Sequence, residues 1–387
     1  MPAGRWRIDR LVEDVALLGR RGLPREQYYR EVAARLRRVF DSDAACWHTL
    51  DPGTRLITSD ASGELITAGV YTPATIADAG ARLIASEYFI RDVNTFAGLA
   101  SRRVPVGILS QATKGRPERS ARYRDLLAPS GIPFELRAAF VSRGRVWGAV
   151  HLARGEHGPD FTAEDARALA SVTGAIADGI RTSMRFDAAR DGRDATRPGL
   201  VVLGAGNEIE MITPPARELL AGMESGHAGS DTTPPTPVLA LADFTRGWAG
   251  SKCQATDAVA VPTSSGWVTL HASLPEGHAD GRVAIVLERN PSQHSTALRL
   301  EVDGVTARER EVATLLAQGL TNSEIADRLV LSPYTVQDHI KNLFEKTGVS
   351  SRQELIARVF LDDYMPQLAQ RTKLTSSGTF STDGARA

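Results

Sequence analysis

The fold of the C-terminal part of the chain is decided by two neighbouring segments, Gly319-Leu-Thr-Asn-Ser-Glu-Ile-Ala326 and Leu331-Ser-Pro-Tyr-Thr-Val-Gln-Asp-His339. In the first segment, Thr321 is followed three residues later by Glu324. This spacing is typical of a capping box, in which the hydroxyl accepts a hydrogen bond from a first-turn amide and the carboxylate accepts one from the amide of the capping residue. The first segment therefore predicts a helix that begins directly after Thr321.

The second segment predicts another helix after a very short turn. Ser332 can cap this helix, and Pro333 suits its first position because the amide that proline lacks would have no partner there. The two helices span about 322–329 and 333–347, so only three residues join them. A link of this length forces two helices to cross steeply, as they do in a helix-turn-helix unit.

Similar signals flank this pair and extend the prediction to four short helices. Two more capping boxes are present, and two glycines stand where helices must end in a left-handed residue. Each cap contributes about 0.5–2 kcal/mol to helix stability. The capping boxes are Thr306 with Glu309 and Ser351 with Glu354, and the glycines are Gly319 and Gly348.

The third predicted helix has one apolar stripe and one polar face. Val336, Ile340 and Leu343 fall on a narrow stripe, which we expect to pack on the other helices. The opposite face offers amide, ammonium and hydroxyl groups, which hold phosphates and contact base edges in the major groove. A four-helix packing unit with a solvated face fits the helix pattern equally well. The polar face carries Tyr334, Gln337, Asp338, Lys341 and Glu345.

The residues themselves favour the first alternative. The two segments quoted above, together with Thr306-Ala-Arg-Glu-Arg-Glu-Val312 and Lys346-Thr-Gly-Val-Ser-Ser-Arg352, closely resemble the LuxR-type DNA-binding domain without a gap. The resemblance implies an all-α four-helix domain over 300–363 that binds double-stranded DNA, with the third helix in the major groove and the fourth supporting a homodimer. It assigns base reading to Gln337, Asp338 and Lys341, and phosphate contacts to Thr321, Tyr334, Thr335, His339 and Lys346.

Two positions on the third helix depart from this family. The family often has Lys or Arg in place of Gln337, and a neutral residue in place of Asp338. An acidic side chain near phosphates is repelled unless it accepts from a cytosine amino group, so Asp338 is either a specificity residue or a local liability. Residues 306–359 contain seven Lys/Arg and seven Asp/Glu. We therefore expect weak, salt-dependent binding by one domain, strengthened by two half-sites per dimer.

The residues before the C-terminal domain predict two α+β domains. Residues 1–186 resemble a GAF domain, a small-molecule or interaction module, chiefly through Phe161-Thr-Ala-Glu-Asp165 at the start of a long helix that ends near Ile180. Other signals in this region predict a helix over 26–40, a strand over 44–50, and a hairpin within 140–152 that turns at 143–145. The charged stretch 187–198 predicts a linker.

Residues 199–290 resemble a PAS domain, and no internal repeat is visible. The chain is therefore expected to be multidomain, in the order GAF-like, PAS-like, LuxR-type, which resembles an arrangement of actinobacterial regulators. The loop and tail are expected from runs of Gly, Ser, Thr and Pro. The expected elements are strands over 200–203 and 208–212, a helix over 216–223, a loop over 225–237, strands over 266–274 and 282–287, and a disordered tail over 372–387.

Composition excludes several classes of protein. The chain has 387 residues, zero formal net charge and 42% hydrophobic residues, which fits a globular protein of several domains. No apolar run approaches the roughly 20 residues of a membrane span, and the N-terminus lacks the apolar core of a signal peptide. Two distant cysteines, Cys46 and Cys253, fit a reducing compartment. We therefore expect a cytoplasmic protein without membrane association.

The N-terminal part offers no credible catalytic set, so we predict no enzymatic activity and no cofactor. Gly204 and Gly206 follow a strand as in a dinucleotide fingerprint, but the third glycine is absent, so a hairpin is expected. Cys46 and His48 share one strand face, yet such a pair without further ligands more often packs, and we assign no metal site. The residues that line either a ligand pocket or the core are Cys46, His48, Tyr88, Phe89, Phe96 and Trp147.

These features predict a DNA-binding transcription regulator. The N-terminal domains would sense a small-molecule effector or a partner and bias how two output domains meet DNA, with RNA polymerase as a further candidate partner. One alternative is a constitutive DNA binder whose N-terminal domains only dimerise or recruit partners. The other is a ligand, redox or metal sensor that acts mainly through protein–protein contacts.

Overall fold

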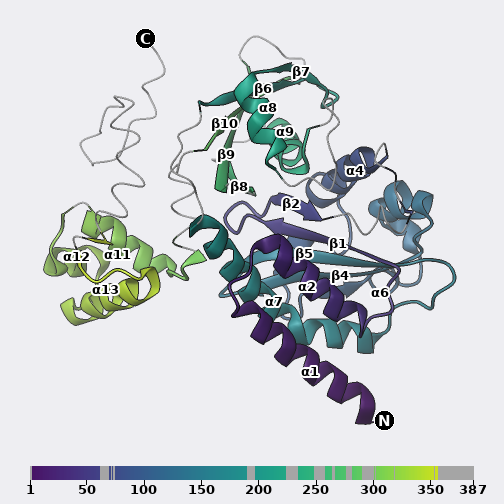
Figure 1. Cartoon of the computed structure of the whole chain (residues 1–387), viewed down its shortest axis with the longest axis horizontal. Helices are drawn as coiled ribbons and strands as arrows, with labels where there is room; N and C mark the ends of the chain where they lie inside the picture. Colours follow the sequence, from purple (N-terminus) through teal and green to yellow (C-terminus); the bar gives the residue numbers. More distant parts are fainter. Residues whose placement is uncertain are drawn as a thin grey trace. The chain divides into compact units, whose positions relative to one another are not determined.

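The computed structural model divides the chain into two compact units, residues 1–289 and 290–387 (Figure 1). The tail predicted over 372–387, the core of the predicted linker and most of the predicted fourth helix lie outside the described residues. The structure describes residues 2–61, 69–70, 72, 75–189, 197–223, 234–247, 258–263, 266–275, 281–289, 300, 302–317, 319–352 and 354–355.

The first unit contains two five-stranded antiparallel sheets (Figure 1). The strand order is β2-β1-β5-β4-β3 in the first sheet and β7-β6-β10-β9-β8 in the second. Counted from its own first strand, each sheet has the same order, although the sequence shows no repeat. The strands of the first sheet are β1 (Ala44–Leu50), β2 (Ile57–Ala61), β3 (Val106–Ile108), β4 (Phe134–Ser142) and β5 (Arg145–Arg154).

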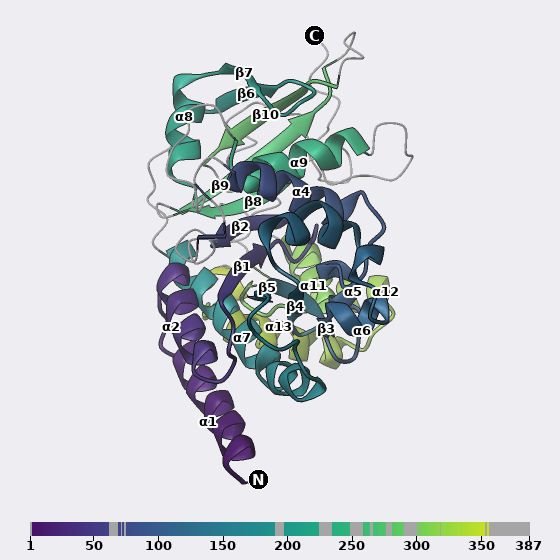
Figure 2. The same ribbon diagram turned by 90° about the vertical axis from the view of Figure 1, so that its right-hand side faces the viewer.

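Helices cover both faces of the first sheet (Figure 2). Successive strand residues point to opposite faces. In β1, Trp47 accordingly lies against Tyr29, whereas His48 lies against Phe96. The Trp47 face is covered by α1 (Pro2–Gly19), α2 (Arg25–Arg37) and α7 (Ala163–Ala189), and the His48 face by α4 (Ile76–Tyr88), α5 (Phe96–Ala100), α6 (Leu109–Thr113) and short 3-10 and π turns within 117–130.

Several predicted elements of this domain are confirmed. Strand β1 has the predicted bounds, and α2 begins at Arg25, one residue before the predicted start. The Thr162–Asp165 capping box is formed at the start of α7. The hairpin between β4 and β5 turns at Arg143 and Gly144, whose φ angles of 53° and 73° are those of a type I′ turn. Between β2 and β4 the sequence predicts no element, whereas the structure has the 13-residue helix α4 and several short elements.

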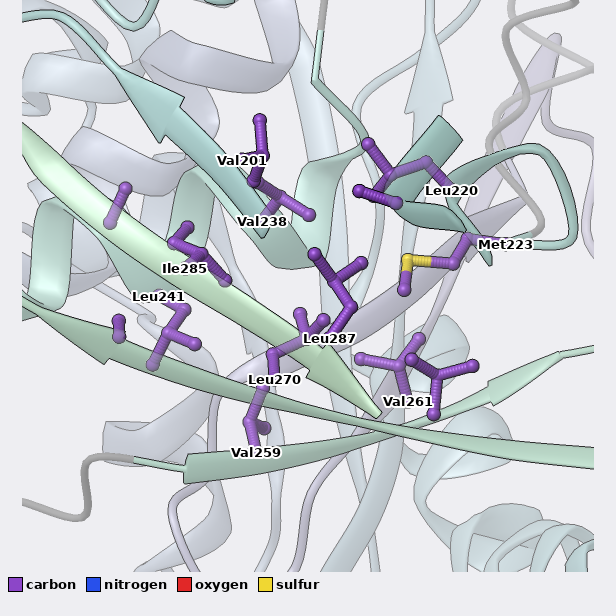
Figure 3. Packing of buried hydrophobic residues seen from close by; sticks show 14 of the residues in the cluster. Val201, Leu220, Met223, Val238, Leu241, Val259, Val261, Leu270, Ile285 and Leu287 are labelled. Carbon is purple, nitrogen blue, oxygen red and sulfur yellow. The ribbon is translucent and has the colours of Figure 1, made fainter. Parts of the chain in front are cut away.

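The second sheet packs one face against two helices (Figure 3). Alternate residues of its strands form an aliphatic core, among them Val201, Leu270 and Ile285, because one face of each strand turns inward. Two helices that follow the second strand of this sheet in the chain complete the core with Leu219 and Leu241. The elements are β6 (Gly199–Leu203), β7 (Ile209–Ile212), α8 (Pro214–Ala221), α9 (Thr236–Gly247), β8 (Ala258–Thr263), β9 (Gly266–Ser273) and β10 (Val283–Glu288).

The sequence-based description of the second domain is wrong in two places. The loop expected over 225–237 extends too far, because α9 already begins at Thr236 and includes Pro237, and proline is tolerated in the first turn of a helix. Strand β8 is not predicted. It lies at the edge of the sheet, where Pro262 costs no ladder hydrogen bond.

The two sheet domains of the first unit share side chains. Leu56, which precedes β2, belongs to the core cluster of the second sheet, and Ala240 of α9 belongs to that of the first. The guanidinium of Arg25 donates to the Ser59 hydroxyl at 2.7 Å and to the Pro262 carbonyl at 3.4 Å. Residues 1–289 therefore form one compact unit that contains both sheet domains.

The described part of the second unit contains three helices around one apolar core. They are α11 (Ala307–Ala317), α12 (Asn322–Leu329) and α13 (Pro333–Thr347), and the bounds predicted for the second and third helices are confirmed. Gly319 and Gly348 have positive φ angles of 86° and 70°, as predicted for helix ends. Ser351 accepts from the Glu354 amide as the cap of the next predicted helix, whereas the Glu354 carboxylate accepts from Ser350, one residue before the predicted partner.

The turn between α12 and α13 contains a strained residue. Val330 ends α12 in the left-handed conformation, with φ 55° and ψ 52°, and its side chain is 90% exposed. A β-branched residue is a genuine outlier in this region, and the left-handed conformation costs roughly 1–2 kcal/mol for a residue with a Cβ.

We predict that Val330→Asn stabilises the second unit by about 1 kcal/mol, because asparagine adopts this conformation far more readily. The measurement is hydrogen exchange of the α11–α13 amides in the full chain. Val330→Ala is the matched control, since alanine keeps the left-handed cost and should give little gain. Faster exchange in the asparagine variant than in the wild type would contradict the prediction.

Candidate nucleic-acid interface

The start of each helix in the pair α12 and α13 is fixed by its cap. The Thr321 amide donates to the Glu324 carboxylate at 2.7 Å, and the Glu324 amide donates back to the Thr321 hydroxyl at 3.4 Å. The Ser332 hydroxyl accepts from the Thr335 amide at 3.0 Å. Both caps satisfy first-turn amides. They therefore fix the residues at which α12 and α13 begin, on either side of the turn at residues 330–332.

The apolar stripe of α13 faces the core, as predicted. Val336, Ile340 and Leu343 are buried with residues of α11 and α12. The predicted base-reading residues Gln337, Asp338 and Lys341 are exposed on the other side of the helix, as the helical period requires. Asn342 is exposed next to Asp338 and was not singled out from the sequence, although its amide has the same hydrogen-bonding chemistry as that of Gln337.

The predicted phosphate-contacting residues differ in how available they are. Tyr334 is 81% exposed in the first turn of α13, where helix amides and the helix dipole favour anions. Thr321 is exposed, but its hydroxyl serves the capping box. The Thr335 hydroxyl lies 2.8 Å from that of Ser332, and His339 is half-buried. Tyr334 is therefore the most accessible of the five.

Lys346, the fifth predicted phosphate contact, has a structural partner. Its Nζ lies 2.6 Å and 2.5 Å from the two carboxylate oxygens of Glu309 on α11, and Glu309 is only 3% exposed. Burial raises the pKa of Glu309, but hydrogen bonds from Lys346 and Thr306 outweigh burial and hold the pKa below its usual range. This pair ties α13 to α11 across the core.

Two arginines bind the backbone around α12, which sequence reasoning did not predict. Arg308 on α11 donates to the Leu329 carbonyl at 2.5 Å, next to the left-handed Val330. Arg352 donates to the Leu320 carbonyl and, at 3.3 Å, to the Asn322 side chain. Both guanidiniums satisfy carbonyl and amide oxygens at the ends of α12. Lys346, Arg308 and Arg352 are three of the seven basic residues of this domain, and all three hold the helix pair in place.

Comparisons with known proteins agree on this part of the chain. Residues 303–359 match the family described as "Bacterial regulatory proteins, luxR family". Over 58 residues the chain is 55% identical to the transcriptional regulatory protein UhpA of Escherichia coli (strain K12), which is 15% of this chain and 30% of that protein. Over 68 residues it is 43% identical to the monoamine regulon transcriptional regulator of Klebsiella aerogenes, 18% of this chain and 28% of that protein. The chain thus spans less than a third of each relative.

Residues 303–359 form a LuxR-type helix-turn-helix DNA-binding domain. In this LuxR-type domain, α12 and α13 are the helix-turn-helix pair. A solved structure titled as the phage VqmA-DPO complex is 22% identical, covers 42% of this chain and 80% of its own, and has a TM-score of 0.23, too low for the two folds to be equated. The N-terminal sheet domains remain of unassigned type.

The residues predicted to line a pocket in the first domain do not form one cluster. Cys46, His48 and Phe96 are buried on the α5 face of the first sheet. Tyr88 lies between the two sheet cores, where its hydroxyl accepts from the Ile57 amide at 2.9 Å. The other two are elsewhere: Phe89 is 41% exposed, and Trp147 is buried beside the β4–β5 turn, where it donates to the Ser142 carbonyl.

The α5 face also holds a buried ionic cluster that the sequence did not reveal. Arg122 donates to the Glu135 carboxylate at 2.8 Å, and Arg137 lies 2.6 Å from Glu87. Burial raises the pKa of Glu135, but Arg122 and Arg137 outweigh it and bring the pKa to about 2. One signal was present: Glu135 and Arg137 are two apart in β4 and so point to the same face, which for charged residues in a central strand is unusual.

The described ranges contain no helix that could cross a membrane and no group of three His, Cys, Asp or Glu side chains placed to hold a metal ion.

The Glu309–Lys346 pair gives a stability prediction with a defined pH dependence. Lys346→Met leaves a buried carboxylate without its ammonium partner, which should destabilise the LuxR-type domain by about 1–3 kcal/mol at pH 7. Because the pKa of Glu309 is depressed, the pair stabilises fully above the ordinary carboxyl pKa of about 4.3, and this contribution is lost as the pH falls through the folded-state value. The difference between variant and wild type should therefore shrink in acid.

The measurement is the protection of α11–α13 amides against hydrogen exchange in the full chain, at pH 7 and below pH 4. Lys341→Met is the matched control, because it removes the same charge from an exposed position on the same helix. Equal protection in the two variants would show that the Lys346 pair does not stabilise the domain.

Proposed function

We propose that the protein is a cytoplasmic DNA-binding transcription regulator whose LuxR-type domain reads the major groove through α13. The observation that carries this proposal is the exposed surface of Gln337, Asp338 and Lys341 on a helix whose other side is locked into the core. Amide and ammonium groups on such a helix match the hydrogen-bonding edges of bases. Tyr334 and the first-turn amides of α13 would hold a phosphate and set the depth of the helix in the groove.

The proposed unit of binding is a homodimer on two half-sites about one helical turn apart. The support is energetic: the LuxR-type domain has as many acidic as basic residues over 306–359, and Lys346, Arg308 and Arg352 are engaged in structural contacts. Few cations are left to neutralise phosphates, so one domain should bind weakly. Linking two domains raises the effective affinity without new contacts. RNA polymerase is the proposed further partner of the bound dimer.

The two sheet domains are proposed to be GAF-like and PAS-like sensors that bias how the output domains meet DNA. Two observations support a sensory role. Both sheets have the same strand order, and the first contains a charged cluster in its interior, which apolar residues of similar size could often replace without loss of stability. In the alternative, the chain senses a ligand and acts mainly through protein–protein contacts, which Asp338 on the exposed face favours.

The first experiment measures binding of the purified full chain to the DNA upstream of its own gene and to a random duplex, over a series of salt concentrations. Saturable, sequence-selective binding with a steep salt dependence is expected, since each phosphate contact releases counterions. Weak and equal binding to both duplexes at all salt concentrations would favour the protein-contact alternative.

We predict that Lys341→Ala weakens binding to the selected duplex by about 1–3 kcal/mol, as removal of a base contact should. Arg30→Ala is the matched control, because Arg30 is an exposed cation of α2 in the first unit and carries the same charge. Competition binding at fixed salt measures both variants. An equal effect of the two substitutions would mean that Lys341 acts only through net charge.

We also predict that Asp338→Asn raises affinity for random duplex, because it removes a negative charge from the face that meets phosphates. The same titration on the selected duplex separates the two roles left open for Asp338. A gain on both duplexes identifies a liability, whereas a gain on the random duplex with a loss of selectivity identifies a contact to cytosine. Reduced affinity for random duplex would contradict the prediction.

A further inference from the structure

The α5 face of the first sheet contains polar side chains whose hydrogen-bonding capacity is not used. His48 and Arg137 are 0% exposed, and His151 is 5% exposed. Within the described part of the chain, both ring nitrogens of His48, Nδ1 of His151, and Nε and Nη2 of Arg137 have no hydrogen-bond partner. Buried polar atoms in folded proteins almost always have a partner, either in the protein or in an ordered water or ligand, so several such atoms at one place indicate that a further group binds there.

The three residues that carry these atoms lie on one face of the sheet. Residue pairing places Cys46 opposite His151, His151 opposite Arg137, and Arg137 opposite Gly107, so one line of side chains crosses β1, β5, β4 and β3. Residues paired across antiparallel strands point to the same face. His48 lies two residues along β1 from Cys46 and therefore shares this face.

Phe96 of α5 lies at the centre of the unpartnered groups. The guanidinium carbon of Arg137 is 3.8 Å from the centre of the Phe96 ring, and the His48 ring is 5.2 Å from it. The rings of His48 and His151 are 5.9 Å apart. We call these four residues the Arg137 site. It combines a flat apolar surface with N–H groups that can rotate little, because Arg137 is fixed by Glu87 and the Asn94 carbonyl.

The charges around the Arg137 site determine what it can accept. Two guanidiniums, Arg122 and Arg137, face three carboxylates, Glu87, Asp92 and Glu135, and all five side chains are at most 2% exposed. Burial lowers the pKa of His151 to about 4 and that of His48 well below its usual value, so both rings are neutral at pH 7. The cluster therefore carries a net negative charge in a low-dielectric interior, where a further anion is repelled.

A cation fits no better, because the unpartnered Nε and Nη2 of Arg137 are donors on a group that is itself positively charged and repels it. What remains is capacity for hydrogen bonds with an uncharged group, supplied by the donors of Arg137 and by His48, whose neutral ring has one donor and one acceptor nitrogen. We propose that the Arg137 site binds a small, flat, uncharged organic molecule whose carbonyl-type acceptors take these N–H groups and whose ring packs against Phe96. This inference deepens the proposed sensory function and rests on it, since it names the class of effector that the first domain would sense.

The test uses three probes of nearly equal size and shape: benzamide, benzoate and benzamidine. Ligand-observed NMR with the full-length protein at pH 7 measures the dissociation constant of each. Benzamide, which is uncharged and has a carbonyl acceptor, is expected to bind at least about tenfold more tightly than the anion or the cation, a difference of 1.4 kcal/mol. Equal binding of the three probes, or no binding of benzamide, would overturn the proposal.

His48→Phe tests the place of binding. This variant keeps an aromatic ring but removes two unpartnered nitrogens, so the melting temperature should be unchanged or higher, while benzamide binding falls at least about tenfold. Thr173→Val on α7 is the matched control, because it removes a buried hydroxyl on the other face of the sheet and should leave benzamide binding unchanged. A lower melting temperature in His48→Phe than in the control would show that His48 is structural and would overturn the proposal.

If His48→Phe still binds benzamide, the probe binds elsewhere in the protein, and this result would also overturn the proposal. Neither readout involves DNA. If the protein binds benzamide as expected but does not bind the DNA upstream of its gene selectively, the ligand site stands and the proposed regulator function fails. The two failures are therefore distinguishable.

Discussion

The three-residue connection between α12 and α13 is the constraint on which the C-terminal domain depends. Its ends are fixed by the left-handed Val330 and by the Ser332 cap, so α13 has no freedom to rotate about its own axis. Val336, Ile340 and Leu343 must then point inward, and Gln337, Asp338 and Lys341 must point outward. The geometry of the turn therefore determines which side chains of α13 are available to contact a nucleic acid.

Charged residues serve the fold in both units, which changes how their number should be interpreted. Lys346 and Arg308 hold the helices of the LuxR-type domain together, so the count of basic residues overstates the positive charge available to DNA. In the first sheet, Arg137 with Glu87 and Arg122 with Glu135 are buried outright. Buried pairs rarely add stability over apolar residues of similar size. Folding stability alone therefore does not explain their presence in the first domain.

The sequence predicted those elements whose signals come from residues close together in the chain. Thr321 with Glu324, Ser332 with Pro333 and the turn at Arg143-Gly144 are signals between residues at most three apart, and each element is as expected. The ion pair of Arg137 with Glu87 and its hydrogen bond to the Asn94 carbonyl join residues more than 40 apart in the chain, and no local period marks them. Strand alternation placed Cys46 and His48 on one face, but not His151, whose position follows only from the register of β1 against β5. The equal strand order of the two sheets is likewise invisible in a sequence without repeats.

The shared side chains between the two sheet domains have a practical consequence for anyone dividing this protein. Leu56 and Tyr88 fill the core of the second sheet, and Ala240 fills that of the first. A fragment that ends near residue 190 would expose Leu56 and Tyr88 and would remove the contact of the Arg25 guanidinium with Pro262. Exposed patches of this kind promote aggregation. The smallest fragment with an intact interior therefore extends to residue 289, and heat or denaturant should melt both sheets in a single cooperative transition.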